Sequence, residues 1–415
     1  MRRVGETTKR PLRIAVVTET YPPEVNGVAR TIGAMVECLR TRGHSLQLIR
    51  PRQSRADVEA NGPGLETVLR PGLPLPRYRE LRMGLPAKRA LLRAWREHRP
   101  DIVQVVTEGP LGQSAVGAAR QLAVPVVSEF HTNYHDYSRH YGFGLFSKVV
   151  AGYLRRLHNR SDCTLVPTDE LKMQLAAAGY RRLAVVGRGI DLDLFGAHRR
   201  DRELRRSWDA TDRDPVVAYV GRLAPEKNLP LFVEACRAMQ AADARLRVVL
   251  VGDGPAGQAL RASHRGFVFA GMRSGVDLAR HYASADALLF PSLTETFGNV
   301  TTEAMASRLA VVAFDYGAAR QHIRDRANGL LAPFGKPAAF TAAALELAAD
   351  RNLRERLRAA ARQTAEGLSW DRVVDDLEAV FREVIDCVRA SYVTPATSNR
   401  SPGALRKREA DRAPL

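Results

Sequence analysis

Short apolar runs alternate with longer segments of helical periodicity along most of the chain. The first half contains such runs at 12–20, 44–51, 101–107, 125–132, 163–168 and 183–189, and the second half at 216–222, 246–254, 267–272, 287–292 and 310–315. The runs are continuous and rich in β-branched residues, which is typical of strands buried on both faces. Helical segments such as 28–42 and 228–242 intervene. We therefore expect an α/β fold built from doubly wound parallel sheets.

The strand–helix pattern occurs twice, and this predicts two domains. A chain of 415 residues exceeds the size at which one core stops growing, about 250–300 residues. The polar segment 191–214 separates the two sets of runs. We expect Rossmann-like domains over 1–190 and 191–367, a helix over 368–390 and a disordered basic tail over 391–415. A ligand held between two such domains would meet the loops that follow the strands.

The charge of the chain is unusual, although its apolar and charged fractions are ordinary. Lys and Arg total 63 against 45 Asp and Glu, which gives a net charge of +18. A basic surface attracts nucleic acid, anionic lipid or phosphorylated ligands. The four Cys fit neither a zinc site nor a disulfide framework. No apolar run is long enough to span a bilayer, and no signal peptide is visible, so we expect a cytoplasmic protein whose membrane contact is peripheral.

The loop over 293–306 follows a predicted strand and contains two carboxylates, Glu295 and Glu303, eight residues apart. Over eight helical residues the rise would be about 12 Å with a rotation of roughly 80°, so the two would touch different parts of one long ligand. Gly298 lets backbone approach that ligand, and a helix start favours an anion. A capping Glu295 and a solvated Glu303 are the alternative.

Two cations follow another strand, in the loop over 219–228. Arg222 and Lys227 can clamp a diphosphate, although solvated surface cations would have the same spacing. Only seven of the 63 basic residues are Lys, which favours a particular role for Lys227. In the first half, Asn26-Gly27 is a turn signal before a helix, and Gly27 could face the same diphosphate.

His131 follows a strand end within an aromatic- and His-rich segment over 128–142, and could polarise a group above the sheet. A G-x-G-x-x-G pattern at Gly252, Gly254 and Gly257 matches the dinucleotide fingerprint formally. Pro255 removes one backbone donor from that loop, so we interpret it as a tight turn near the nucleotide. An NAD-binding enzyme remains the competing interpretation of this pattern.

Taken together and in this order, these motifs resemble the retaining GT-B glycosyltransferases, the large family with an E-x7-E motif that contains lipid mannosyltransferases, sulfoquinovosyl transferases and sucrose synthases. The resemblance covers residues 12 to 385 and depends on the E-x7-E pair, GRLAPEKN, VGDGP and FHTNYHDYSRHYG. It implies two Rossmann-like domains facing a cleft, with the acceptor on the first and the nucleotide-sugar donor on the second. The helix near Trp370 would cross back onto the first domain.

The resemblance also implies roles for single residues. Glu295 would contact the hydroxyls of the transferred sugar, and Glu303 would hold the nucleotide ribose. Arg222 and Lys227 would neutralise the leaving diphosphate, on which the backbone at Gly27 would close. His131 would hydrogen-bond the sugar near the anomeric centre, making it catalytic together with Glu295, Arg222 and Lys227. The remaining donor contacts would be Gly252, Gly271, Met272, Thr296, Phe297, Gly298 and Asn299.

The motifs look most like those of GDP-mannose-dependent α-mannosyltransferases with a lipid or glycan acceptor. A UDP-sugar-dependent glucosyl or sulfoquinovosyl transferase is the near alternative. From other classes, the alternatives are an NAD-binding enzyme and a nucleic-acid-binding protein, although no nucleic-acid module is recognisable. No D-x-D motif is evident in a catalytic position, so we expect no metal, with the two cations in its place.

Residues 77–99 hold eight Lys and Arg against two Glu, a net charge of +6. The part over 87–99 has the pattern of a basic amphipathic helix with Trp95, which suits an anionic membrane surface. The alternative is a solvated helix that packs Leu91, Leu92 and Trp95 inward.

Overall fold

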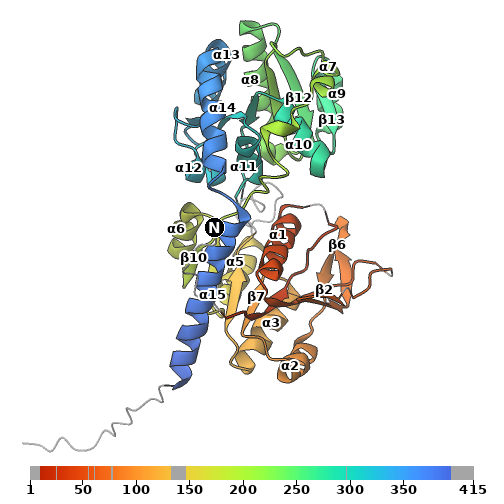
Figure 1. The fold of residues 1–415 in the computed structure, drawn as a ribbon, viewed down its shortest axis with the longest axis vertical. Coiled ribbons are helices and arrows are strands. Elements are labelled where there is room, and N and C mark those ends of the chain that lie inside the picture. Colours follow the sequence, from red (N-terminus) through yellow and green to blue (C-terminus); the bar gives the residue numbers. More distant parts are fainter. Residues whose placement is uncertain are drawn as a thin grey trace, which may run out of the picture.

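The computed structural model describes residues 10–24, 26–54, 56–59, 61–75, 78–131, 146–295 and 297–393, and Figure 1 shows their course. Two separate parallel sheets form, one from each half of the chain, as the repeated strand–helix pattern predicts. Each sheet is flanked by helices on both faces, which confirms the expected α/β class and its doubly wound character.

The first sheet has the order β10-β9-β8-β7-β1-β2-β4-β3, parallel except for the last pair. Its strands are β1 (Arg13–Val17), β2 (Ser45–Pro51), β3 (Asn61–Gly62), β4 (Leu65–Arg70), β7 (Ile102–Val105), β8 (Val126–Glu129), β9 (Cys163–Val166) and β10 (Leu183–Val185). Its helices are α1 (Gly27–Thr41), α2 (Lys88–Glu97), α3 (Pro110–Gln121), α5 (Phe146–His158) and α6 (Asp169–Ala177).

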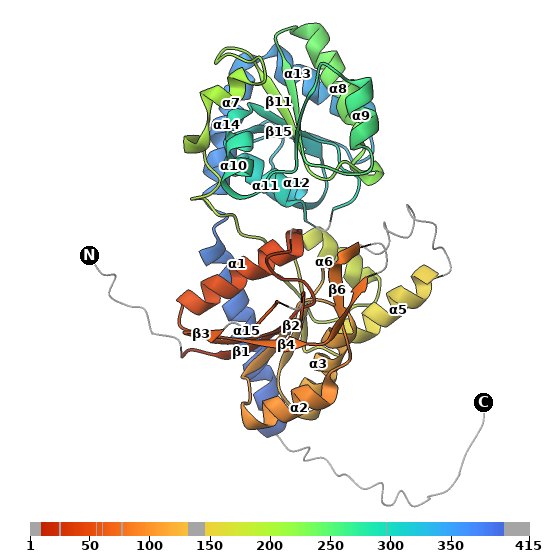
Figure 2. The ribbon, with the colours of Figure 1, turned by 90° about the vertical axis from the view of Figure 1, so that its right-hand side faces the viewer.

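Alternate residues of β1 supply the cores on the two faces of this sheet. Ile14 and Val16 pack with α1, whereas Ala15 and Val17 pack with α2 and α3. Figure 2 shows α1 on one side of the sheet and α2 and α3 on the other. A separate antiparallel pair, β5 (Gly72–Leu75) and β6 (Tyr78–Gly84), lies beside this domain.

The second sheet is entirely parallel, in the order β13-β12-β11-β14-β15-β16. Its strands are β11 (Val216–Val220), β12 (Arg247–Val251), β13 (Val268–Gly271), β14 (Ala287–Phe290), β15 (Ala310–Phe314) and β16 (Leu330–Ala332). Its helices are η1 (Ala197–Arg199), α7 (Arg202–Arg206), η2 (Pro225–Lys227), α8 (Leu229–Ala242), α9 (Gly257–Ser263), α10 (Gly275–Ser284), α11 (Asn299–Ala306), α12 (Gly317–His322), α13 (Pro337–Ala349) and α14 (Arg351–Ala365).

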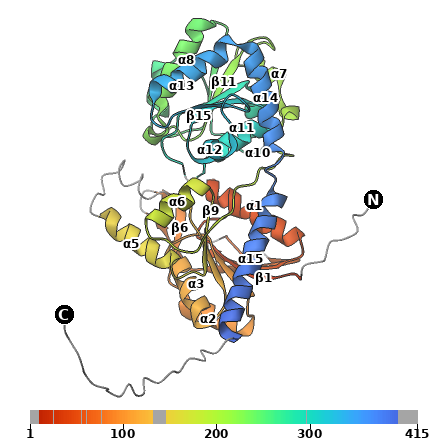
Figure 3. The same cartoon turned by 90° about the vertical axis from the view of Figure 1, so that its left-hand side faces the viewer.

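The last helix, α15 (Trp370–Val393), follows the second sheet in sequence but packs on the first. Figure 3 shows it beside β1. Val374, Leu377 and Phe381 are fully buried in the core that α1 and β1 share. At the crossing between the domains, Ile190 pairs with Ser369 in a parallel bridge, and its N–H donates to Leu368 O at 2.8 Å. The chain therefore passes between the two halves twice, side by side.

All eleven expected strands form, but five others do not appear in the apolar pattern: β3, β4, β5, β6 and β16. Strands β3, β4, β5 and β16 are short or partly exposed, and β6 lies inside the basic segment 77–99. The helix expected over 368–390 extends to Val393, and the remainder of the predicted tail lies outside the described residues.

Candidate functional site

Lys227 and Glu295 form an ion pair at the carboxyl edge of the second sheet. Lys227 ends η2, which follows β11, and Glu295 lies in the loop after β14. Since β11 and β14 are neighbours in the sheet, the loops that follow them meet. Ser292 Oγ also donates to Glu295 Oε1 at 2.8 Å, and Lys227 Nζ lies 3.3 Å from Thr294 O. Each member of the ion pair stays partly accessible, as a ligand site requires.

Arg222 lies on the same loop as Lys227, and its side chain is 41% exposed. Its Nη1 lies 3.8 Å from Glu226 Oε1. The loop is held by the turn after β12: Leu223 N–H donates to Asp253 O at 2.9 Å. The two sequence-predicted cations therefore share one partly open loop.

The G-x-G-x-x-G glycines serve this loop packing. Gly252 has a φ of +135°, and a Cβ there would overlap the Gly221 carbonyl oxygen. At Gly254, with a φ of +157°, a Cβ would lie 2.5 Å from Leu223 O. The glycines thus let the turn after β12 lie directly against the loop that holds Arg222, which accounts for the pattern without a dinucleotide.

Helix α11 begins at Asn299, four residues after Glu295, so the two Glu residues do not lie on one continuous helix. Glu295 precedes the helix, so the expected 12 Å helical rise between Glu295 and Glu303 is wrong. Gly298 enters the helix with a φ of +99°, which glycine adopts readily. Phe297 is buried, and its carbonyl oxygen accepts from Ala318 N–H at 2.6 Å. Thr296 lies outside the described residues.

The N-terminus of α1 faces the N-terminus of α11 across the two domains. Asn26 caps α1 by accepting from Ala29 N–H at 2.8 Å, and Gly27 is the first helical residue. A Cβ at Gly27 would lie 3.9 Å from Asn299 Nδ2. Since α1 follows β1 and α11 follows β14, the carboxyl edges of the two sheets face each other. Two helix N-termini converge on one region, which favours an anion there.

Glu303 is buried one turn into α11. Its Oε2 accepts from the Tyr282 hydroxyl at 2.9 Å, and its Oε1 accepts from Arg30 Nη2 of α1 at 2.7 Å. Burial raises the pKa of Glu303, while Arg30 and Tyr282 favour the ionised form. Glu303 is therefore not the solvated residue of the alternative interpretation.

His131 follows β8 and belongs to a buried charged cluster. Its Nε2 lies 2.7 Å from Glu129 Oε2, and its Nδ1 lies 2.8 Å from Arg188 Nη2. Glu129 also accepts from Gln104. Burial acts to raise the pKa of Glu129, but His131 and Arg188 outweigh it and lower that pKa to about 2. The cluster fixes the imidazole at the carboxyl edge of the first sheet.

Gly271 ends β13, the edge strand of the second sheet, and Met272 follows it. Gly271 has a φ of +75°, and its carbonyl oxygen accepts from Gly252 N–H at 2.9 Å. Met272 is 63% exposed, an unusual position for a large apolar side chain. Both residues are available to a planar apolar group such as a base.

The basic helix expected over 87–99 is α2, and its apolar side is occupied. Leu91 and Trp95 are each 1% exposed, Leu92 packs beside them, and Trp95 Nε1–H donates to Gln47 at 3.0 Å. Leu91 and Trp95 therefore pack inward, as the alternative interpretation expects, and contact of this segment with a membrane stays a prediction. The cations of α2 remain on the surface: Lys88, Arg89, Arg93 and Arg96.

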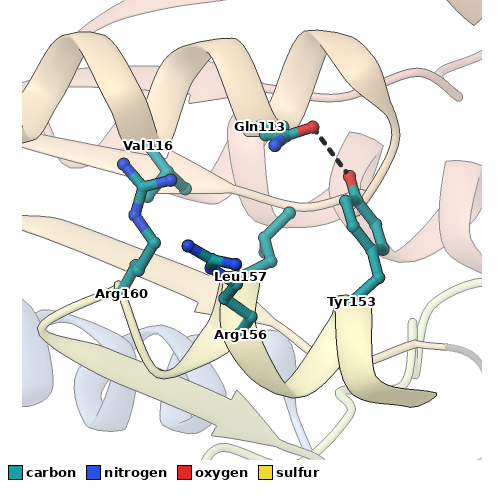
Figure 4. A pocket seen from close by; sticks show the side chains of 6 residues that line it. All are labelled: Gln113, Val116, Tyr153, Arg156, Leu157 and Arg160. Atoms are coloured by element: carbon teal, nitrogen blue, oxygen red, sulfur yellow. Dashed lines mark hydrogen bonds between the residues drawn. The ribbon is translucent and has the colours of Figure 1, made fainter. Parts of the chain in front are cut away.

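A groove of about 250 Å³ lies between α3 and α5, and Figure 4 shows its lining. Arg156 and Arg160 line it together with the buried Leu157 and with Val116. Tyr153 donates to Glu108 O at 2.8 Å, in the loop after β7. Because α2 packs on α3, the α2 cations and these two arginines belong to one helical layer.

Within the described residues, no cluster of three or more His, Cys, Asp or Glu has an arrangement that would hold a metal ion. In the same part of the chain, no helix is both long and apolar enough to cross a bilayer.

Sequence reasoning missed four residues of these sites: Arg30, Glu129, Arg188 and Tyr282. Glu129 stands at a strand end two residues before His131, and Arg188 follows the strand β10. Their positions at or just after strand ends indicate candidate site residues in the sequence itself. Arg30 and Tyr282 lie inside helices, where an isolated polar residue gives no indication of a partner more than 20 residues away.

Two family models match the chain. "Glycosyl transferases group 1" matches residues 214–350, and "Glycosyltransferase Family 4" matches residues 25–194. The boundary between the two matches falls in the segment between the two sheets.

Curated relatives match almost the whole chain. A GDP-mannose-dependent alpha-mannosyltransferase of Mycobacterium tuberculosis is 35% identical over 90% of this chain and 97% of its own length. A sulfoquinovosyl transferase of Arabidopsis thaliana is 29% identical over 88% of this chain and 72% of its own.

Solved structures show the same fold at low identity. Sucrose-phosphate synthase of Thermosynechococcus elongatus superposes with a TM-score of 0.74 at 18% identity, covering 91% of this chain and all of the other. Anabaena HepE, solved with UDP and glucose, gives a TM-score of 0.68 at 18% identity over 90% of this chain and all of its own.

Proposed function

The chain belongs to the glycosyl transferases of group 1. We propose that it transfers mannose from GDP-mannose to a lipid or glycan acceptor, with retention of configuration. Members of this family use nucleotide-sugar donors, so the proposal concerns the base, the sugar, the acceptor and the roles of single residues. The 35% identity to a GDP-mannose-dependent enzyme supports the choice of donor.

The observation that carries the proposal is the convergence of charge between the sheets. The N-termini of α1 and α11 face each other, and Lys227 reaches the loop immediately before α11. Arg222 lies on the same loop as Lys227. A diphosphate placed here would meet two cations and two sets of free backbone N–H groups. These groups would stabilise the charge that develops as the diphosphate leaves.

The sugar would lie between the Glu295 loop and His131. We propose that Glu295 accepts from sugar hydroxyls, and that Lys227 then exchanges this carboxylate for the diphosphate. The ring nitrogens of His131 face Glu129 and Arg188, so His131 would hydrogen-bond the sugar near the anomeric carbon by exchanging one of these partners for it. Glu303 would hold the ribose, and the backbone at Gly271 and Met272 would meet the base.

The proposed reaction is attack by the acceptor hydroxyl on the face from which the diphosphate departs. A bond forms between the acceptor oxygen and the anomeric carbon as the bond from that carbon to the phosphate oxygen breaks. A departing phosphate oxygen takes the proton of the acceptor hydroxyl. Meeting of the two sheet edges would exclude water, which would otherwise hydrolyse the donor. The anomeric configuration of the product tests this step, since an inverted linkage excludes same-face attack.

The acceptor would bind to the first domain, and we propose that this domain meets an anionic membrane surface on its cytoplasmic side. Support comes from the exposed cations of α2 and from Arg156 and Arg160 in the groove beside α3. The contact would be electrostatic, because the apolar residues of α2 are buried.

Thermal unfolding with separate nucleotides tests the donor. GDP at about 100 times its Kd should add about 2.7 kcal/mol to the free energy of unfolding, whereas UDP, NAD and an oligonucleotide should add little. Stabilisation by UDP in place of GDP would transfer the assignment to a UDP-sugar. Stabilisation by NAD alone would contradict the proposed donor site.

A further inference from the structure

The carboxylate of Glu303 is closed off by a side chain from the other domain. Arg30, on α1 of the first domain, donates to Glu303 Oε1 at 2.7 Å, while Tyr282 of the second domain occupies Oε2. Glu303 retains 7% exposure of its side chain, whereas Arg30 retains 45%. Thus each carboxylate oxygen already has a partner, and Arg30, the partner from the first domain, is the more exposed of the two.

We propose that Arg30 is a latch that lowers the affinity of the donor site: it covers Glu303 in the donor-free enzyme, and the nucleoside ribose must displace it to bind. The proposal rests on the proposed role of Glu303 as the ribose ligand. On this proposal the affinity for the nucleotide reflects two opposing terms. One is the free energy gained when the ribose binds Glu303, and the other is the free energy lost when the Arg30–Glu303 pair breaks.

The two partners of Glu303 differ in how readily they can leave. Tyr282 is fully buried and packs edge-on against Phe195, so its hydroxyl has no route away from Glu303. The guanidinium of Arg30 lies 5.9 Å from the centre of the Phe195 ring and is open to water on its other side. On leaving Glu303, the 45% exposed Arg30 can exchange the carboxylate for solvent, while the incoming ribose takes its place on the buried Glu303.

The latch also joins the two domains. Arg30 and Glu303 belong to the two helices whose N-termini face each other, so their pair holds α1 against α11 when the site is empty. A second contact of the same kind joins Glu170 of α6 to the α12 segment, through Arg320 at 2.8 Å and Gly317 N–H at 3.2 Å. That second pair involves no proposed donor ligand, so displacement of Arg30 need not separate the domains.

The latch acts against the product as well as against the donor. After transfer, the nucleoside diphosphate holds Glu303 through the same ribose, and return of Arg30 to Glu303 competes with it. Removal of Arg30 should therefore strengthen nucleotide binding, mainly through slower dissociation. If Arg30 instead bound the ribose or the phosphate directly, its removal would weaken nucleotide binding.

Isothermal titration of GDP into the full-length wild type and the Arg30→Ala and Arg30→Lys variants tests the latch. The titrations are run at alkaline pH, which favours the ionised carboxylate, since burial and the loss of Arg30 both raise the pKa of Glu303. We expect Arg30→Ala to bind GDP about 2- to 5-fold more tightly than wild type, and Arg30→Lys, which keeps the charge, to resemble wild type. The KM for GDP-mannose should fall with the Kd.

The matched control is Arg326→Ala, which removes an exposed ion pair to Glu346 inside the second domain and should leave the GDP affinity unchanged. Arg30→Gln serves as the second variant if Arg30→Ala unfolds, and tighter binding is expected there too. Unchanged or weaker binding of GDP to a folded Arg30 variant, with wild type binding normally, overturns the latch. Failure of wild type to bind GDP or UDP would instead overturn the proposed function.

Discussion

Lys227 and Glu295 neutralise each other although 68 residues separate them in the sequence. The parallel pairing of β11 with β14 brings their loops together, and the surrounding backbone keeps both side chains partly accessible. A charged pair at a sheet edge that faces a second sheet edge is suited to exchange partners with a ligand of both signs, such as a sugar joined to a diphosphate.

Replacing either member of this pair should abolish transfer and spare the fold. We expect Glu295→Gln or Lys227→Ala to lower kcat by about 100-fold or more, because each removes a stabilising group from the transition state. The free energy of unfolding should change by about 1 kcal/mol at most, since the pair is partly solvated. Lys336→Ala, at an exposed position before α13, is the control. Full activity in both site variants would contradict the assignment.

The buried cluster around His131 should depend on its charges. Glu129→Gln would leave Arg188 buried beside a neutral side chain, and we expect a loss of about 3 kcal/mol in the free energy of unfolding. Chemical denaturation measures this loss. If the variant were as stable as wild type, the cluster would not hold His131 as described.

The same cluster predicts a pH dependence of stability. The pKa of Glu129 falls from its ordinary value of 4.5 to about 2 on folding, so the unfolded chain takes up the proton first as the pH drops. The stability that ionised Glu129 contributes is complete above pH 4.5 and is lost as the pH falls from there toward 2. Denaturation curves at several pH values should show a steeper acid loss in wild type than in Glu129→Gln. Equal slopes would remove Glu129 as the cause.

The G-x-G-x-x-G turn should be sensitive for a steric reason. Gly252→Ala places a Cβ against the Gly221 carbonyl oxygen at a φ that Ala rarely adopts. We expect a loss of about 3 kcal/mol in stability and weaker nucleotide binding, because the loop that holds Arg222 is displaced. Gly266→Ala has no atom within 4 Å of the added Cβ and should be silent. A stable Gly252→Ala variant with normal affinity would disprove the packing role.

The membrane proposal predicts that exposed cations and buried apolar residues of α2 have different effects when they are replaced. Arg89→Glu with Arg93→Glu should reduce sedimentation with phosphatidylglycerol vesicles at low salt and leave the melting temperature near that of wild type. Trp95→Ala should instead lower stability by about 3 kcal/mol, since it empties a fully buried site. Undiminished vesicle binding by the charge-reversed protein would exclude α2 as the contact.

The apolar pattern predicted eleven strands, most of them buried, because parallel strands with two covered faces leave a continuous signal. It missed β4, in which buried and partly buried residues alternate, and β6, whose sequence YRELRMG is interspersed with polar residues. The sequence predicted Arg222, Lys227, Glu295 and Gly298 as site residues because cations, carboxylates and glycines in loops after strands are typical of ligand sites. The sequence could not reveal the pair of Arg30 with Glu303, because it forms only when two separately folded sheets meet.

The helix α15 has a consequence for how the chain is made. Val374, Leu377 and Phe381 belong to the core of the first sheet, yet the ribosome delivers them after the whole second sheet has emerged. The half that is synthesised first must therefore wait for the end of the chain to complete its core, while the second half can fold at once. During this interval the apolar face formed by α1 and β1 is uncovered and open to chaperones.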